Sequence, residues 1–190
     1  MKTVYFLLFL VSFTVVRAQS DSVFTDLDLA IKAGSGVKVL ILKRQKLTQI
    51  PADIFLLTNL TELNLRGNKI TSVPTKISDL THLKYLNLGK NRIDSIPTEI
   101  GDLVKLEYLN LEKNPFEFLP KSIGALVDLK YLSIDYTNVK DVSYQIKNCK
   151  KLTFFNCRHS YIDVDNTKKI KKWLPDNCVK LFPVTCNCNS

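Results

Sequence analysis

A stretch in the middle of the chain repeats with a fixed period, and this feature constrains the fold more than any other. Residues 60–128 divide without gaps into three rows of twenty-three residues: LTELNLRGNKITSVPTKISDLTH, LKYLNLGKNRIDSIPTEIGDLVK and LEYLNLEKNPFEFLPKSIGALVD. Each row has a leucine, a Leu-x-Leu centre, an asparagine and a tail of the form apolar-Pro-x-x-Ile-x-x-Leu. A fixed period of this length predicts stacked repeats, each of which covers the apolar edge of its neighbour.

Six repeats share one register, and they begin at Val37, Leu60, Leu83, Leu106, Leu129 and Leu152. The alternating Leu-x-Leu centre predicts a short strand with its leucines inward, and neighbouring strands are expected to form one parallel sheet. The proline-containing tail returns the chain on the outer side. The asparagine column, at Asn68, Asn91 and Asn114, is expected to satisfy buried backbone groups inside each turn, because unpaired groups there are costly.

Both ends of the repeat stack need a cap, since a solenoid exposes the apolar edge of its terminal repeats. We expect a helix over Ser20–Ala33, capped by Ser20 or Asp21 and ended by glycines. A second helix is expected over Asp165–Leu174, capped by Asp165 and stopped by Pro175, followed by an edge strand over Cys178–Phe182. The predicted organisation is a signal peptide at 1–18, a cap helix within 19–36, six repeats over 37–173, and a cap and tail over 174–190.

The first eighteen residues are predicted to be a secretory signal peptide. Lys2 gives a positive start, Val4–Val16 is almost wholly apolar, and Ala18 supplies a small residue at the cleavage position. The run is too short to span a membrane, and no later run reaches that length. We therefore expect a secreted, extracellular protein without a transmembrane segment.

Three columns of side chains are expected on the outward side of the sheet. Period-two alternation sends the third, fifth and seventh residue of each repeat away from the buried leucines. The third-position column is aromatic in four consecutive repeats, at Tyr85, Tyr108, Tyr131 and Phe154. The fifth-position column offers amides, at Asn64, Asn87, Asn110 and Asn156. The seventh-position column adds charges, at Arg66, Glu112, Asp135 and Arg158.

Rigid aromatic area beside adaptable hydrogen-bonding groups is typical of a binding surface. We therefore expect the aromatic column to anchor a ligand, the amide column to form hydrogen bonds with it, and the charged column to set specificity. The alternative is that the rings only pack across strands and stabilise the sheet. Repeat duplication alone would also copy a tyrosine down the column.

A basic cluster offers a second functional hypothesis. Seven lysines gather near the last repeat and its helix, at Lys147, Lys150, Lys151, Lys168, Lys169, Lys171 and Lys172. They would attract anionic polymers or surfaces, although a solvated helix face explains them more simply. Nucleic acid is not expected as a partner, because no aromatic residues interleave with these lysines.

All five cysteines lie in the last quarter of the chain, at Cys149, Cys157, Cys178, Cys186 and Cys188. Cys149 and Cys157 replace core aliphatic residues of earlier repeats, so we expect them to be buried free thiols. The alternative is a C-terminal disulfide cap, whose pairing the spacing leaves open and whose odd count leaves one thiol over. A metal site using Cys157, His159, Cys186 and Cys188 is disfavoured because Cys157 should face inward.

The sequence lacks the arrangements that catalysis requires. It contains two histidines and no glycine-rich phosphate loop. Glu112 and Asp135 lie one repeat apart, and paired carboxylates hydrolyse glycosides, but an open sheet offers no water-excluding pocket. We expect these acids to be balanced by Lys113 and Arg158. The sequence therefore predicts a non-enzymatic protein with no cofactor and no metal.

The six rows resemble the leucine-rich-repeat pattern L-x-x-L-x-L-x-x-N-x-L, in its 23-residue extracellular class. The short leading helix and the run Ile170–Cys178 resemble the ends of small exported bacterial members of this family. The resemblance implies an α/β fold: a right-handed solenoid with a concave parallel sheet, an N-terminal cap helix, and a C-terminal cap helix with an edge strand. It implies a monomeric module that binds a protein ligand, or a glycan, on the concave face.

Overall fold

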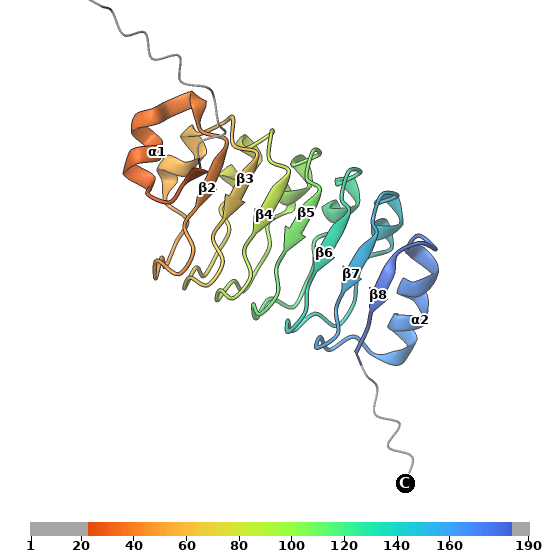
Figure 1. Ribbon diagram of the computed structural model, residues 1–190. Coiled ribbons are helices and arrows are strands. Elements are labelled where there is room, and N and C mark those ends of the chain that lie inside the picture. Colours follow the sequence, from red (N-terminus) through yellow and green to blue (C-terminus); the bar gives the residue numbers. More distant parts are fainter. Residues whose placement is uncertain (1–22, 184–190) are drawn as a thin grey trace, which may run out of the picture.

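A computed structural model of the chain describes residues 23–183. They form one open sheet of eight parallel strands in sequence order (Figure 1). Equivalent residues of neighbouring repeats pair in register, as Tyr85 does with Tyr108. The strands are β1 (Val23–Phe24), β2 (Val39–Ile41), β3 (Glu62–Asn64), β4 (Tyr85–Asn87), β5 (Tyr108–Asn110), β6 (Tyr131–Ser133), β7 (Phe154–Asn156) and β8 (Val179–Leu181).

A row of short 3₁₀ helices covers the other side of the repeats. They are η2 (Ala52–Leu56), η3 (Thr75–Asp79), η4 (Thr98–Asp102), η5 (Lys121–Ala125) and η6 (Tyr144–Asn148). Proline precedes four of them, since its fixed φ suits the entry to a helix. The core lies between this row and the sheet, and it buries the inward leucines of every repeat, as predicted.

The predicted asparagine column is confirmed as a ladder of buried hydrogen bonds, which we call the turn ladder: Asn68, Asn91 and Asn114. Asn91 Nδ2 donates to the carbonyl oxygens of Leu65 at 3.1 Å and Leu88 at 2.8 Å, and its Oδ1 accepts from the Ile70 amide at 3.1 Å. Each amide therefore ties its own turn to the preceding repeat. Thr137 reaches only its own repeat, through Ile134 O.

The N-terminal cap differs from the expected helix over Ser20–Ala33. The helix α1 spans Leu27–Ala33, and Asp26 caps it by accepting a hydrogen bond from the Leu29 amide at 2.9 Å. Val23 and Phe24 instead form β1, because their backbone pairs with β2 and extends the sheet. The predicted apolar face is confirmed, since Phe24, Leu27 and Ile31 pack against the core.

The C-terminal cap contains the expected helix and edge strand. The helix α2 spans Val164–Trp173 and buries Thr167 and Ile170, while β8 pairs with β7. The N-cap of α2 is Asp163, which accepts a hydrogen bond from the Asn166 amide at 2.7 Å. The predicted N-cap, Asp165, lies in the first turn of the helix instead. No helix within residues 23–183 is long and apolar enough to cross a membrane. The predicted signal peptide and both terminal cysteines lie outside the described residues.

Candidate functional site

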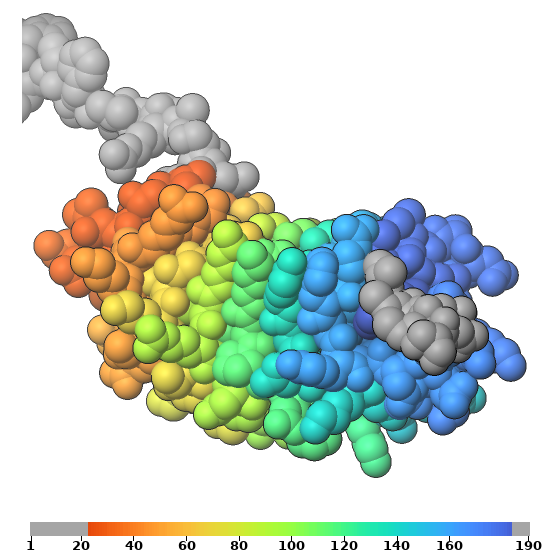
Figure 2. All heavy atoms as spheres, turned by 90° about the horizontal axis from the view of Figure 1, so that it is seen from below, coloured from red at the N-terminus to blue at the C-terminus, as the bar shows by residue number. Residues whose placement is uncertain are grey.

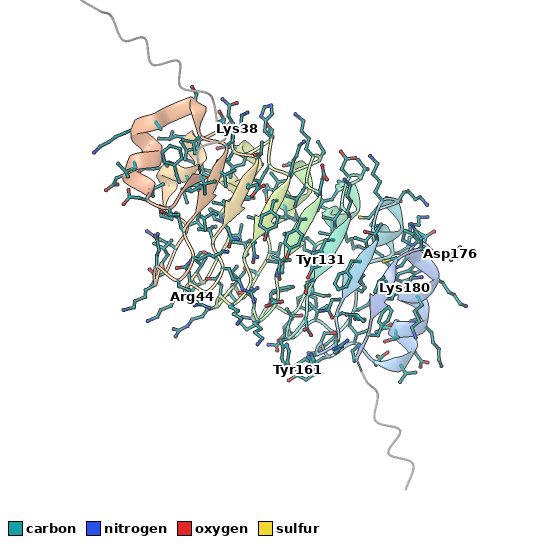
Figure 3. All side chains as sticks on the ribbon, viewed as in Figure 1. Lys38, Arg44, Tyr131, Tyr161, Asp176 and Lys180 are labelled. Atoms are coloured by element: carbon teal, nitrogen blue, oxygen red, sulfur yellow. The ribbon has the colours of Figure 1, made fainter. Side chains whose placement is uncertain are left out.

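The four aromatic rings of the third-position column form one continuous stack on the open face of the sheet. We call Tyr85, Tyr108, Tyr131 and Phe154 the aromatic ladder. Successive ring centroids are 4.2, 4.2 and 4.7 Å apart, with interplanar angles of 10°, 10° and 2°. Each residue is partly exposed, and Figure 3 shows Tyr131 on the sheet away from both edges. The strand register therefore produces a flat aromatic strip that solvent reaches.

The ladder is an uncharged surface. Burial raises the pKa of Tyr108, and the neighbouring hydroxyls of Tyr131 and Tyr85 also disfavour a negative charge there. The Tyr85 hydroxyl accepts a hydrogen bond from Asn87 Nδ2 at 3.2 Å. Because the rings stack face to face, the strip exposes apolar ring edges with hydroxyl groups along one side, and this combination suits contact with mixed apolar and polar ligands.

The fifth-position amides lie on the same face but are largely covered by their neighbours. The exposed fractions are 7% for Asn64, 5% for Asn87 and 3% for Asn110, while Asn156 is half-buried. Each accepts a hydrogen bond from the backbone amide two residues later, as Asn110 does from Glu112 at 2.9 Å. These four side chains hold the end of each strand in place, and they leave the aromatic ladder as the main accessible feature.

The expected pairing of Glu112 with Lys113 is wrong. Glu112 Oε1 instead lies 2.6 Å from Arg66 Nη2, two repeats away, and both side chains are partly exposed. The pair passes over Gly89, where an added Cβ would lie 3.0 Å from both Arg66 Nη1 and Glu112 Cγ. The glycine that interrupts the charged column was the sequence signal for this long-range pair, and sequence reasoning missed it.

The expected pairing of Asp135 with Arg158 is also wrong. Asp135 Oδ1 accepts hydrogen bonds from the backbone amide of His159 at 2.9 Å and lies 2.8 Å from its Nδ1. The His159 ring stacks on Tyr136 with centroids 4.0 Å apart, and Lys113 Nζ lies 4.9 Å from the Tyr136 ring centroid. These side chains form a polar and aromatic rim beside the ladder.

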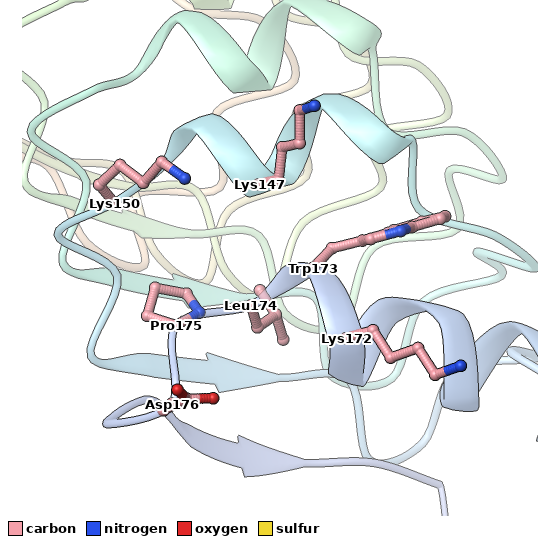
Figure 4. A pocket seen from close by; sticks show the side chains of 7 residues that line it. All are labelled: Lys147, Lys150, Lys172, Trp173, Leu174, Pro175 and Asp176. Atoms are coloured by element: carbon pink, nitrogen blue, oxygen red, sulfur yellow. The ribbon is translucent and has the colours of Figure 1, made fainter.

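The C-terminal lysines line a shallow pocket between η6 and α2. Its volume is about 270 Å³, and Figure 4 shows Lys147, Lys150 and Lys172 around it. Trp173 contributes an aromatic wall and packs edge-on against Tyr144, with ring centroids 5.4 Å apart. The lysines of α2 point away from the core, as a solvated helix face requires.

The three described cysteines are buried free thiols, as expected for Cys149 and Cys157. Burial raises the pKa of Cys149 to about 11 and that of Cys157 to about 12, so both stay protonated at neutral pH. Burial also raises the pKa of Cys178. Within residues 23–183, no three His, Cys, Asp or Glu side chains group closely enough to hold a metal ion.

Solved structures with a similar fold include bacterial leucine-rich-repeat proteins and plant receptor ectodomains. A leucine-rich-repeat protein of Leptospira interrogans is 28% identical, with a TM-score of 0.61, over 78% of this chain and 43% of that chain. An internalin of Listeria monocytogenes has a TM-score of 0.65 over 86% of this chain and 52% of that one, and its 19% identity supports the fold alone.

A plant ectodomain is also similar: that of the membrane receptor kinase GASSHO1/SCHENGEN3 from Arabidopsis thaliana, solved with CASPARIAN STRIP INTEGRITY FACTOR 2. It is 28% identical, with a TM-score of 0.60, over 66% of this chain and 16% of that chain. The chain thus spans less than half of the Leptospira protein and about a sixth of the plant ectodomain.

Family comparisons agree with the repeat register. A model described as a leucine-rich repeat region matches residues 75–174, and one described as a leucine-rich repeat matches residues 35–93. No curated protein matches the sequence. Together, the matched models, the repeat spacing and the parallel sheet show that the chain belongs to the leucine-rich-repeat family.

Proposed function

We propose that the protein is a secreted, non-enzymatic recognition module that binds a protein ligand on the concave face of the sheet. The carrying observation is the aromatic ladder, a continuous ring stack that stays partly exposed although the side chains around it are buried or paired. A stack whose only role was to stabilise the sheet would gain more from full burial, because hydrophobic stabilisation grows with the area removed from water.

The rim of the ladder supports a protein as the ligand. Aromatic anchors surrounded by polar and charged groups are the composition of protein-binding hot spots. Glu112 forms an ion pair with Arg66, and Asp135 forms a hydrogen bond with the His159 backbone amide, while Arg158 adds an exposed cation. The half-buried amide of Asn156 lies at the Phe154 end of the ladder, whereas Asn64, Asn87 and Asn110 act by holding the strands that carry it.

Two similar structures also support a protein or peptide as the ligand. The GASSHO1/SCHENGEN3 ectodomain is bound to CASPARIAN STRIP INTEGRITY FACTOR 2, and the plant peptide hormone receptor RGFR1 is bound to RGF2. Both are much longer than this chain, so their ligands indicate only the class of partner. A glycan is the second class of ligand that we consider, because the tyrosine hydroxyls can form hydrogen bonds with sugar hydroxyls. We propose a monomer that acts without a cofactor.

The test is affinity capture with the purified chain from the medium in which the protein naturally occurs. The Tyr108→Ala/Tyr131→Ala variant removes the centre of the ladder. A matched control, Tyr144→Ala/Tyr161→Ala, removes two exposed tyrosines from outside it. The proposal predicts a protein captured by the wild type and the control but lost from the ladder variant, with all three chains folded by circular dichroism. Equal capture by all three would contradict it.

A further inference from the structure

One edge of the sheet carries a concentration of positive charge that the proposed function does not use. The turns after β2, β3 and β4 contain residues 43–46, 66–69 and 89–92, and none of these residues is acidic. Seven of the twelve are basic, and we call them the basic edge: Lys43, Arg44, Lys46, Arg66, Lys69, Lys90 and Arg92. The corresponding turns after β5 and β6 contain Glu112 and Asp135 instead.

The parallel sheet brings these turns together. All strands run in one direction, so every turn that follows a strand lies on the same edge, where Figure 3 labels Arg44. Figure 2 looks onto this edge and shows the repeats stacked side by side. Successive turns are therefore separated by about 4.8 Å, the spacing of paired strands. The basic edge is therefore a row of cations that crosses the ends of β2, β3 and β4. It is separate from the lysines of α2, which follow β7.

Most of these charges have no partner within the described part of the chain. Lys43, Arg44, Lys46, Lys69, Lys90 and Arg92 are exposed, and none of the ion pairs found within residues 23–183 includes them. Only Arg66 is paired, with Glu112. Like charges gathered in this way repel one another, and among the ion pairs found within residues 23–183 only that of Arg66 with Glu112 offsets the repulsion.

Several of these cations also occupy a backbone conformation that does not favour them. Arg44, Lys46 and Lys90 have φ of 56°, 62° and 57°, and Lys113 continues the series at 54°. Gly67 takes the place equivalent to Arg44 and Lys90 in the second repeat, with φ of 76°. Glycine or asparagine adopts this region at lower cost than lysine or arginine. Tyr136 occupies the same place with φ of 54°, so the turn imposes this conformation on whichever residue stands there, and the preceding repeats fill the place with glycine or a cation.

The surroundings of the basic edge narrow the class of partner. No exposed large hydrophobic residue lies within residues 43–46, 66–69 or 89–92. The edge therefore lacks the aromatic platforms on which single-stranded nucleic acid stacks and the apolar anchors that enter a lipid surface. What it offers is charge alone at a regular spacing, and a linear polyanion binds such an array by releasing its counterions.

We propose that the basic edge binds a linear acidic polysaccharide, through its sulfate or carboxylate groups, with the polymer lying across the turns after β2, β3 and β4. This goes beyond the proposed binding of a protein on the concave face, because Arg66, which is paired with Glu112, is the one residue that the two surfaces share. A protein ligand on the aromatic ladder and a polysaccharide on the edge would leave each other's contacts free.

The experiment measures binding of the full chain to immobilised heparin, with neutral dextran as the blank, between about 50 and 200 mM salt. The edge variant carries Lys46→Gln, Lys69→Gln, Lys90→Gln and Arg92→Gln. The matched control removes the same number of charges from α2, through Lys168→Gln, Lys169→Gln, Lys171→Gln and Lys172→Gln. Thermal unfolding of each chain verifies that these exposed substitutions leave it folded.

The proposal expects the edge variant to bind heparin about tenfold or more weakly, with a shallower salt dependence, because it has lost up to four counterion-releasing contacts. The α2 control is expected to stay within about threefold of the wild type. Equal losses in both variants would overturn the proposal, since net charge alone would then explain binding. Absence of heparin binding at low salt would overturn it, and so would tighter binding to double-stranded DNA or to phosphatidylserine vesicles than to heparin.

Discussion

The aromatic ladder and the turn ladder are both columns of one residue type repeated at twenty-three residues, yet their surroundings differ. The turn ladder is buried, and each amide bonds to backbone groups of neighbouring repeats. The aromatic ladder is partly exposed, and its rings contact mainly one another. The difference teaches that repetition alone does not distinguish a structural column from a binding column. Accessibility and the saturation of hydrogen bonds do.

Asn91→Ala should give the largest loss of stability. The substitution leaves the Ile70 amide without a partner and removes the hydrogen bonds to Leu65 O and Leu88 O, which keep their bonds from Asn68 and Asn114. With roughly 1–3 kcal/mol for the buried unpaired amide and about 1 kcal/mol for each lost hydrogen bond, we expect a cost of about 3 kcal/mol in urea denaturation. If Asn91→Ala lost less stability than Tyr108→Ala, the comparison would fail, because the turn ladder would then contribute less to the fold than the aromatic ladder.

The buried thiol of Cys149 should make stability fall at alkaline pH. Burial raises its pKa in the folded chain from about 9 to about 11. The unfolded chain therefore loses this proton first, so the stabilisation is complete below pH 9 and is lost as the pH rises toward 11. Linkage gives about 2 kcal/mol over this range for one such thiol. Urea denaturation of wild type and Cys149→Ala should show a smaller alkaline decline in the variant. Identical declines would contradict the shift.

Tyr108→Ala should destabilise the fold less than Asn91→Ala. The ring contributes two stacking contacts, with Tyr85 and Tyr131, from a partly exposed position. Aromatic pairs are worth about 0.5–1.5 kcal/mol each, so we expect a loss of about 1.5 kcal/mol in the same urea experiment. A loss above 3 kcal/mol would assign the aromatic ladder to the structural class and weaken the binding proposal.

Asn87→Ala tests the amide column that lies between the two ladders. Its Oδ1 accepts from the Gly89 amide at 3.1 Å and its Nδ2 donates to the Tyr85 hydroxyl. We expect a cost of about 1 kcal/mol, typical of one net intramolecular hydrogen bond. Captured ligand should remain bound, since the exposed fraction of Asn87 is only 5%. Loss of the ligand without loss of stability would show that this amide contacts it directly.

The pair of Arg66 with Glu112 should have the smallest effect. Both side chains are partly exposed, at 30% and 19%, so solvent screens their attraction. A double-mutant cycle with Arg66→Gln and Glu112→Gln is expected to give a coupling energy below about 1 kcal/mol. A larger coupling would mean that the link across Gly89 holds neighbouring repeats together.

The period and its consequences could be predicted from the sequence because they depend on local pattern. The register of β2–β7, the buried leucines and the bonds of Asn68, Asn91 and Asn114 all follow from spacing. The caps were placed less well. Residues 20–33 read as one helix by periodicity, but pairing with β2 draws Val23–Phe24 into the sheet, and only the tertiary neighbour decides this.

The candidate site shows the same limit. Alternation predicts which face a side chain points to, but it says nothing of what covers it. Asn64, Asn87 and Asn110 do point outward, and they are buried because the strands have only three residues and the neighbouring columns close over them. Glu112 and Asp135 contact side chains of other repeats, Arg66 and His159. These partners could not be predicted from the sequence, because the sequence does not show how far a long side chain extends across the sheet.

Ring resonances of the tyrosines give the most direct test of ligand binding on the aromatic ladder. Tyrosine-labelled protein would be titrated with the captured protein ligand, and ring shifts would be followed by NMR. The account predicts changes for Tyr85, Tyr108 and Tyr131, and none for Tyr144 and Tyr161. Shifts confined to Tyr144 and Tyr161, or no shift at saturating ligand, would contradict it.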